Sequence, residues 1–257
     1  MKKFVRDFEL IANKRINREY YLLVLKLPDK LPELFPGQFV EIRIDNSNDT
    51  FLRRPISLYD VDYEKHRIYL LIQEVGKGTR KLAGLKVGDK LNLIYPLGNS
   101  FSLPGQQGKV LLVGGGVGVA PLLFLARFLT QNNVEPEFLL GFRNNELLVN
   151  LADFEKFGKV HLSTDDGSEG EAGTVMDHSL LKAASFPYVK VYTCGPQVMM
   201  KAVGSFAEAL NVECEASLEN TMACGFGACL CCIQETVRGN LRVCKEGPVF
   251  NTKDLIW

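Results

Sequence analysis

The pattern of apolar and polar positions divides the chain into two differently built segments and a short tail. In the first hundred residues, dense apolar or alternating runs cover Tyr20 to Leu27, Gln38 to Ile44, Ile68 to Val75 and Lys90 to Tyr95. Glycine, proline and asparagine turns separate these runs. Several short strands at this spacing predict an antiparallel barrel or sandwich, with one short helix over Thr79 to Ala83.

From about residue 100 the pattern changes to strands that alternate with helices. Short apolar runs cover Lys109 to Val113, Phe138 to Phe142, Val160 to Ser163 and Val189 to Thr193. Stretches of helical length follow the first run, up to about Leu129, and the last, up to about Leu210. Strands that alternate with helices predict a parallel sheet. The segment Gly98 to Gly108, rich in glycine and proline, is the expected linker.

The tail from about residue 213 has little regular periodicity and contains most of the cysteines. We therefore predict three parts: an antiparallel β-barrel over residues 1–100, a nucleotide-binding α/β domain over 101–212, and a small metal-binding domain over 213–257. The fold class is thus a β domain followed by an α/β domain and a C-terminal metal domain.

Composition and charge exclude several classes of protein. The 257 residues include 46% apolar residues, with 30 Lys and Arg balanced by 30 Asp and Glu. This balance does not favour nucleic acid as a partner, because such binding usually shows a basic excess. No secretion signal is expected at the charged N-terminus. The apolar stretch Val117 to Leu129 is shorter than the ~20 residues of a membrane span and contains Pro121 and Arg127. We therefore expect a soluble, cytoplasmic protein without a membrane partner.

The cysteine cluster is the strongest chemical signal in the sequence. Cys224, Cys229, Cys232 and Cys244 have the spacing C-x4-C-x2-C-x11-C, which is the plant-type arrangement for a 2Fe–2S cluster. Structural zinc is the alternative, but zinc sites usually consist of two short CxxC-like pairs. Cys231 has no place in the pattern and is interpreted as a packing residue. An odd number of clustered cysteines does not fit a secreted disulfide framework.

Two glycine-containing turns follow predicted strands and precede predicted helices. The first contains Gly114, Gly115, Gly116, Gly118 and Pro121, and the second contains Cys194, Gly195 and Pro196. Backbone N–H groups and the dipole at a helix N-terminus favour phosphate binding. A tight turn without a ligand is the alternative for either one. Their shared place at the carboxyl edge of one sheet, where ligands bind, favours a dinucleotide site.

Two segments of the β domain are candidates for contact with a phosphate or a flavin. In Arg54-Pro55-Ile56-Ser57, the arginine can pair with a diphosphate and the serine can approach a flavin ring. Residues i and i+3 of a regular strand point to opposite faces, so this interpretation requires Pro55 to interrupt the alternation. The turn Gly76 to Arg80 is a second candidate, and ordinary loops are the alternative for both.

Together these residues resemble the ferredoxin–NADP reductase superfamily. Arg54 to Ser57 match its flavin motif, although Ile56 replaces the customary aromatic residue, and Gly114 to Pro121 and Cys194 to Pro196 match its nicotinamide motifs. The order of the three parts and the segment Met222 to Phe250 resemble, more specifically, the electron-transfer subunits of NAD-dependent dihydroorotate dehydrogenases. The resemblance covers essentially the whole chain.

The resemblance implies cofactors, a partner and site residues. Such subunits hold FAD and one 2Fe–2S cluster, and pair with an FMN-containing catalytic subunit in a heterotetramer of two plus two. Electrons from dihydroorotate then pass through the cluster and FAD to NAD in pyrimidine biosynthesis. By position, FAD would contact Arg54, Pro55, Ile56, Ser57, Leu71, Ile72, Gln73, Gly78 and Thr79. No catalytic acid or base is expected, because hydride transfer to flavin requires none.

Two other functions fit parts of the sequence. Small subunits of other NAD(P)H-linked oxidoreductases, of the ferredoxin:NADP or sulfide dehydrogenase type, have the same three parts. Some of them carry aspartate at the first cluster position, so Cys224 favours the dihydroorotate family. A non-enzymatic zinc or redox-sensor protein is the more distant alternative. The choice between NAD and NADP stays open: Arg143 follows a predicted strand and is either a contact for a 2′-phosphate or a surface residue.

Overall fold

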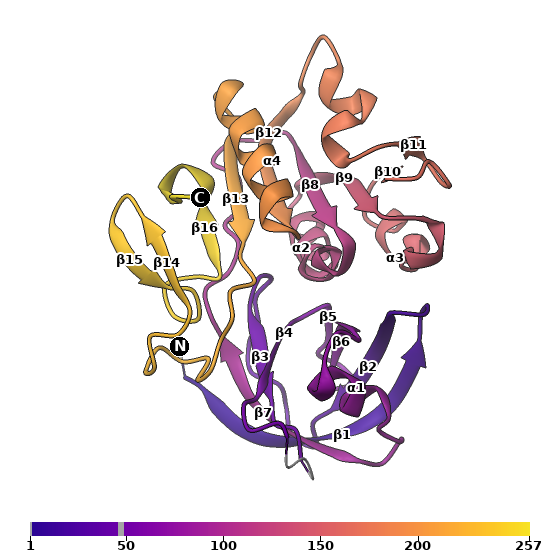
Figure 1. Ribbon diagram of the computed structural model, residues 1–257, viewed down its shortest axis with the longest axis vertical. Helices are drawn as coiled ribbons and strands as arrows, with labels where there is room; N and C mark the ends of the chain where they lie inside the picture. Colours follow the sequence, from indigo (N-terminus) through magenta and orange to yellow (C-terminus); the bar gives the residue numbers. More distant parts are fainter. Residues whose placement is uncertain (1, 46–48) are drawn as a thin grey trace.

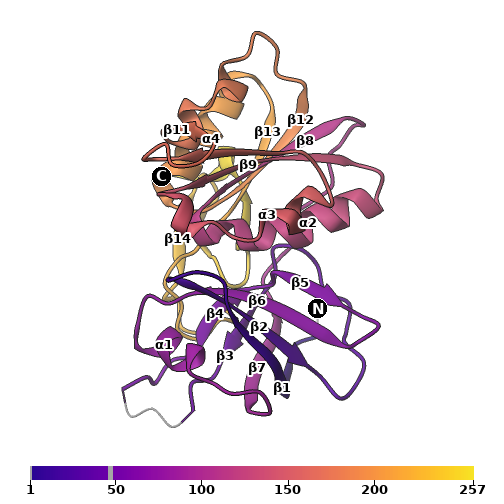
Figure 2. The same ribbon diagram turned by 90° about the vertical axis from the view of Figure 1, so that its right-hand side faces the viewer.

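The computed structural model describes residues 2–45 and 49–257 and contains two large sheets with a small hairpin beside them (Figure 1). The first sheet has seven antiparallel strands in the order β4-β3-β7-β1-β2-β6-β5. Its strands are β1 (Phe4–Arg15), β2 (Tyr20–Lys26), β3 (Phe39–Ile42), β4 (Arg54–Ser57), β5 (Asp60–Asp62), β6 (Arg67–Gln73) and β7 (Lys90–Leu97). The sheet curls around its own apolar core into the predicted barrel-like domain (Figure 2).

Alternating side chains explain how the curled sheet forms. Phe8, Leu23, Leu25 and Leu93 are fully buried inside it, while their strand neighbours are more exposed or lie on its other face. The helix α1 (Lys77–Ala83) begins two residues before the predicted Thr79. The Thr79 hydroxyl accepts hydrogen bonds of 3.0 Å from the backbone N–H groups of residues 75 and 76, which stabilises the helix start.

The second sheet is parallel except for its last strand, in the order β11-β10-β9-β8-β12-β13-β16. Its strands are β8 (Lys109–Gly115), β9 (Glu135–Phe142), β10 (Val160–Thr164), β11 (Glu171–Ala172), β12 (Tyr188–Cys194), β13 (Glu213–Ser217) and β16 (Val249–Asn251). Its helices are α2 (Ala120–Gln131), α3 (Leu151–Glu155) and α4 (Gln197–Ala209). Short 3-10 segments are η1 (Gly116–Val119), η2 (Asn145–Leu147), η3 (Val175–Asp177), η4 (Ser179–Lys182) and η5 (Thr252–Asp254).

The helices cover the two faces of this sheet. Along β8, Val110 and Leu112 pack with α2 and α3, whereas Leu111 and Val113 pack with α4. Helices α2 and α3 lie between the sheet and the barrel, and α4 lies on the far side (Figure 2). The predicted α/β domain is therefore stacked on the barrel through α2. Among the described residues, no helix is long and apolar enough to cross a membrane.

The last segment is more closely tied to the parallel sheet than its sequence indicates. Strands β13 and β16 come from residues 213–257 and form the edge of the second sheet, while β14 (Ile233–Thr236) and β15 (Gly239–Arg242) form a separate hairpin. A third core contains Phe39 of the barrel, Met200 of α4 and Cys244 of the tail. The domain boundary at residue 212 stays a prediction, because the sheet runs across it.

Candidate functional site

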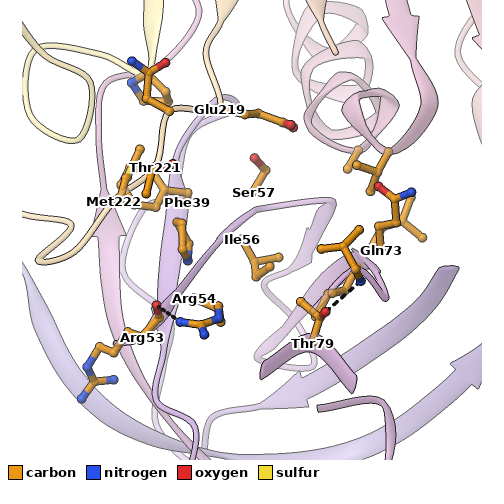
Figure 3. A pocket seen from close by; sticks show the side chains of 18 of the residues that line it. Phe39, Arg53, Arg54, Ile56, Ser57, Gln73, Thr79, Glu219, Thr221 and Met222 are labelled. Atoms are coloured by element: carbon orange, nitrogen blue, oxygen red, sulfur yellow. Dashed lines mark hydrogen bonds between the residues drawn. The ribbon is translucent and has the colours of Figure 1, made fainter. Parts of the chain in front are cut away.

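A cavity of about 550 Å³ lies between the barrel, the start of α2 and the tail. The predicted flavin residues Arg54, Pro55, Ile56, Ser57, Leu71, Ile72, Gln73 and Thr79 line it. Gly78 lies beside it, because a Cβ there would be 2.6 Å from Nε of Arg54. Figure 3 shows Ser57 and Ile56 extending into this space. The volume suits a cofactor-sized ligand.

Strand β4 lines this cavity over its whole length because it is the edge strand of the curled sheet. It pairs with β3 on one side only, and all four of its residues are half-buried. Arg54 and Ser57 therefore reach the same cavity. Arg53 also lines the cavity, but its guanidinium donates to the backbone oxygen and side chain of Asn92 at 2.9 and 2.6 Å.

A second cavity, of about 590 Å³, lies at the carboxyl edge of the parallel sheet. Gly115, Gly116, Gly118, Gly195 and Pro196 line it, so both predicted nucleotide turns meet there. Gly114 lies at the end of β8 beneath the turn, Pro121 lies in the first turn of α2, and Cys194 is buried at the end of β12.

The two turns touch each other closely. A Cβ on Gly118 would lie 2.4 Å from the Cα of Gly195 and 2.6 Å from the backbone oxygen of Cys194. Only glycine allows this approach without moving backbone. The floor of the second cavity therefore depends on the glycine at position 118.

Gln73, Val117 and Glu219 line both cavities and mark the junction between them. The Cys194 thiol donates to Oε1 of Glu219 at 3.9 Å. Burial raises the pKa of Cys194 well above its ordinary value, so the thiol stays protonated. Desolvation by the surrounding protein also raises the pKa of the Glu219 carboxyl group. In Figure 3 the side chains of Glu219 and Ser57 extend into one space.

The sequence did not single out Glu219. The available signal was its position just after the strand β13, at the carboxyl edge of the sheet. Tyr20 was also missed: it belongs to the barrel strand β2, yet it lines the second cavity beside Gly116. Both positions follow from how the domains pack, and no local motif indicates them.

The four predicted cluster cysteines form two adjacent pairs. Cys224 interacts with Cys229, and the backbone N–H of Cys244 donates to the Cys232 sulfur at 3.3 Å. Among the described residues, no three His, Cys, Asp or Glu side chains converge as one metal ion requires. A 2Fe–2S cluster needs two thiolates on each iron, so the paired arrangement fits it.

Backbone amides lower the pKa of the first of these cysteines. Burial acts to raise the pKa of Cys224, but backbone N–H groups, including that of Ala228 at 3.3 Å, outweigh it and lower the pKa to about 6. The thiolate is the form that binds a metal. Cys231 is exposed, so its interpretation as a packing residue was wrong, and its thiol donates to the backbone oxygen of Thr221 at 3.7 Å. Cys214 is buried in β13.

A buried carboxyl group of the barrel contacts this loop. Glu41 lies on β3, directly opposite Pro55 of β4, and is completely buried. A Cβ on Gly225 would lie 2.4 Å from its Cγ, so the side chain contacts the cysteine loop. Burial raises the pKa of Glu41 to about 7. No local motif indicated that this residue would contact the cysteine loop.

Three family models match successive parts of the chain. They are the oxidoreductase FAD-binding domain over residues 7–101, the oxidoreductase NAD-binding domain over 112–205, and the iron–sulfur cluster binding domain of dihydroorotate dehydrogenase B over 219–256. The relative from Clostridium acetobutylicum named dihydroorotate dehydrogenase B (NAD(+)), electron transfer subunit, is 45% identical over 87% of both chains. This chain belongs to that family. A relative of the same name from Shouchella clausii is 35% identical over the full length of both chains.

Family membership confirms several predictions. The chain is an oxidoreductase subunit with FAD-binding, NAD-binding and iron–sulfur-binding domains, and the zinc alternative has no support. The name electron transfer subunit implies a catalytic partner subunit. The roles of individual site residues stay predictions.

Solved structures confirm the predicted architecture. The structure of an NADH-dependent reduced ferredoxin–NADP oxidoreductase superposes with a TM-score of 0.88 at 29% identity, covering 97% of this chain and 90% of that one. The ferredoxin reductase of carbazole 1,9a-dioxygenase superposes with a TM-score of 0.70 at 22% identity, covering 82% of this chain and 67% of that one. The second similarity shows the fold alone.

Proposed function

We propose that this chain takes part in pyrimidine biosynthesis by carrying electrons to NAD through a 2Fe–2S cluster and FAD. The electrons come from an FMN-containing partner subunit, which oxidises dihydroorotate. The observation that supports this most is the junction of the three predicted sites. The flavin cavity shares Gln73, Val117 and Glu219 with the dinucleotide cavity, and its lining includes Met222, two residues before the cysteine loop begins at Cys224. When bound, FAD exchanges two electrons with nicotinamide and single electrons with an iron–sulfur cluster.

The residues of this chain bind and orient the two ligands. Arg54 supplies positive charge for the flavin diphosphate, and the Ser57 hydroxyl offers a hydrogen bond toward the ring. The turns at Gly114 to Gly118 and Cys194 to Pro196 hold the dinucleotide against the junction. Cys224, Cys229, Cys232 and Cys244 hold the cluster, and no residue transfers a proton.

The cysteine loop is the proposed contact with the catalytic subunit. Its apolar side chains Phe226 and Leu230 are 44% and 61% exposed, which favours burial against a partner. We propose a heterotetramer of two catalytic and two electron-transfer subunits. A cytoplasmic location agrees with the need for reduced thiols.

Reconstitution with the catalytic subunit tests the function. The anaerobic complex should form NADH from dihydroorotate and NAD, and the separate chain should lose its flavin absorption when NADH is added. If NADH bleaches the flavin but the complex does not respond to dihydroorotate, the ferredoxin:NADP type of enzyme is favoured. The superposition on such an enzyme at a TM-score of 0.88 supports this second candidate. A protein that binds neither flavin nor iron would refute electron transfer altogether.

A further inference from the structure

The charges around the dinucleotide cavity are few and unevenly placed. Among the residues described along this cavity, Arg143 is the one base, and Asp165 and Glu219 are the two acids. A dinucleotide carries a diphosphate between its two halves, and a buried or half-buried diphosphate needs donors and positive charge. Arg143 is therefore the side chain of interest.

The order of strands in the sheet gives the position of Arg143 relative to the ends of the cavity. Along the carboxyl edge, β12 ends just before Gly195, β8 ends at the glycine turn, β9 ends just before Arg143, and β10 ends just before Asp165. Neighbouring strands are about 4.8 Å apart, so this edge spans about 14 Å. The reactive end of a dinucleotide must lie at the junction with the flavin cavity, near Glu219. Its diphosphate then falls between the glycine turn and Arg143.

Arg143 is already engaged with the other domain. Its guanidinium contacts both carboxylate oxygens of Glu19 at 3.0 and 2.9 Å, and Glu19 also accepts 2.8 Å from the Gln73 amide. Glu19 belongs to the β1–β2 turn of the barrel. The Arg143 side chain is 64% exposed, so a stronger anion can reach it. Because Arg143 lines the cavity, the ion pair connects the cavity lining to the barrel.

Two more contacts join the same turn to the loop after β9. Arg18 pairs with Glu146 at 2.8 Å, and the Asn17 amide donates to the backbone oxygen of Leu148 at 3.1 Å. None of these four residues lines the cavity. Loss of the Arg143–Glu19 pair would therefore weaken this interdomain contact without removing it.

We propose that Arg143 binds the diphosphate of the dinucleotide and exchanges Glu19 for it. Glu19 is then a competitor that holds the arginine at the cavity mouth until the ligand arrives. Dinucleotide binding breaks one of the contacts between the barrel turn and the nucleotide domain. This inference rests on the proposed function, because it requires that the cavity holds NAD.

Binding of ADP and of adenosine to the FAD- and cluster-loaded protein tests the exchange, since only ADP carries the diphosphate. Arg143→Gln should weaken ADP binding at least about tenfold and leave adenosine unchanged, and Arg143→Lys should retain part of the affinity. Glu19→Gln keeps the hydrogen bond to Gln73 in place, and should tighten ADP binding several-fold. The exposed Arg18→Gln, on the same turn, is the matched control and should alter neither probe.

The double variant separates exchange from a general effect of charge. If Glu19 acts by holding Arg143, the gain from Glu19→Gln disappears when Arg143→Gln is also present. An equal gain in both backgrounds overturns the exchange, as does unchanged ADP binding in Arg143→Gln while NADH still bleaches its flavin. Glu19→Gln alone decides the matter if the arginine variants do not fold, because no gain in ADP affinity refutes the inference. A wild-type protein that binds neither ADP nor NADH would instead refute the proposed function.

Discussion

The substitution Gly118→Ala perturbs the closest contact in the dinucleotide cavity. The added Cβ would lie 2.4 Å from the Cα of Gly195, about 1.0 Å inside the 3.4 Å at which ordinary van der Waals contact begins. The neighbours are backbone atoms at the end of β12, which cannot rotate away as a side chain can. The two turns that form the cavity floor must therefore separate.

A displacement of this size has two expected effects. Overpacking usually costs about 1–3 kcal/mol of stability. Misplacement of a reacting group by about 1 Å can lower a rate on the order of 100-fold. We expect kcat/KM for flavin reduction by NADH to fall by that order, measured anaerobically by the loss of flavin absorption. The FAD content should stay unchanged, because most of the residues that line the flavin cavity belong to the barrel.

Gly105→Ala is the matched control for this experiment. No atom lies within 4 Å of a Cβ at Gly105, so both stability and the reduction rate should equal those of the wild type. Dithionite should reduce the flavin of both variants fully, which separates a defect in dinucleotide binding from a loss of cofactor. A wild-type rate of reduction by NADH in Gly118→Ala would refute the reasoning.

Three further predictions concern charged residues. Lys190 is 1% exposed and pairs with two glutamates of β13. Lys190→Met should therefore lower the free energy of unfolding, measured in urea, by about 3 kcal/mol. A loss below about 1 kcal/mol would contradict this. Burial opposes ionisation of Glu137, but bonds from Lys109, Tyr188 and His161 outweigh it and lower its pKa to about 2. The resulting stabilisation, about 3 kcal/mol, is complete above about pH 4.5 and is lost as the pH falls towards 2, so unfolding of Glu137→Gln should depend less on pH in this range. Asp165 lines the dinucleotide cavity, where a carboxylate repels a 2′-phosphate, so Asp165→Asn should raise kcat/KM for NADPH about tenfold, and an unchanged preference for NADH would count against this role.

The sequence pattern predicted a strand or helix correctly where the element has dense or regularly spaced apolar residues that become buried. The strands β2, β6 and β8 and the helix α2 have dense or periodic apolar residues, and each lies close to its predicted range. The twelve-residue strand β1 was missed because only Phe8 and Leu10 of it are buried. Its pairing with β2 and β7 stabilises a charged sequence that has little strand pattern of its own.

The tail illustrates a different limit. Glu215 of β13 is 8% exposed although it is charged, because Lys190 of β12 pairs with it at 3.1 Å and Ser102 donates to it from the linker. From the sequence alone, a glutamate is expected to be exposed at the surface. The strand therefore has an irregular pattern, and its partner 25 positions away in the sequence supplies the reason for its burial.

The residues of the candidate site also differ in whether a local motif could predict them. Cysteine spacing was sufficient to predict an iron–sulfur-binding tail, which the matching domain confirms, and the glycine turns were recognisable because each joins a strand to a helix. Glu219, Glu41 and Glu19 had no such signal. Each is a carboxylate whose surroundings come from another part of the chain, so its role depends on packing between domains.

The path of the chain explains why the cysteine loop lies beside the flavin cavity. Strand β13 runs parallel to β12, so it ends at the same carboxyl edge as Cys194 and the glycine turns. The chain leaves the sheet at this edge, passes Glu219 and forms the loop that begins at Cys224, and β16 then returns antiparallel to β13. Both ends of the tail are thereby fixed to the nucleotide domain, while its loop contacts Glu41 of the barrel. The position of the loop is thus set by the strand order of the sheet, and the spacing of its cysteines determines only what it can bind.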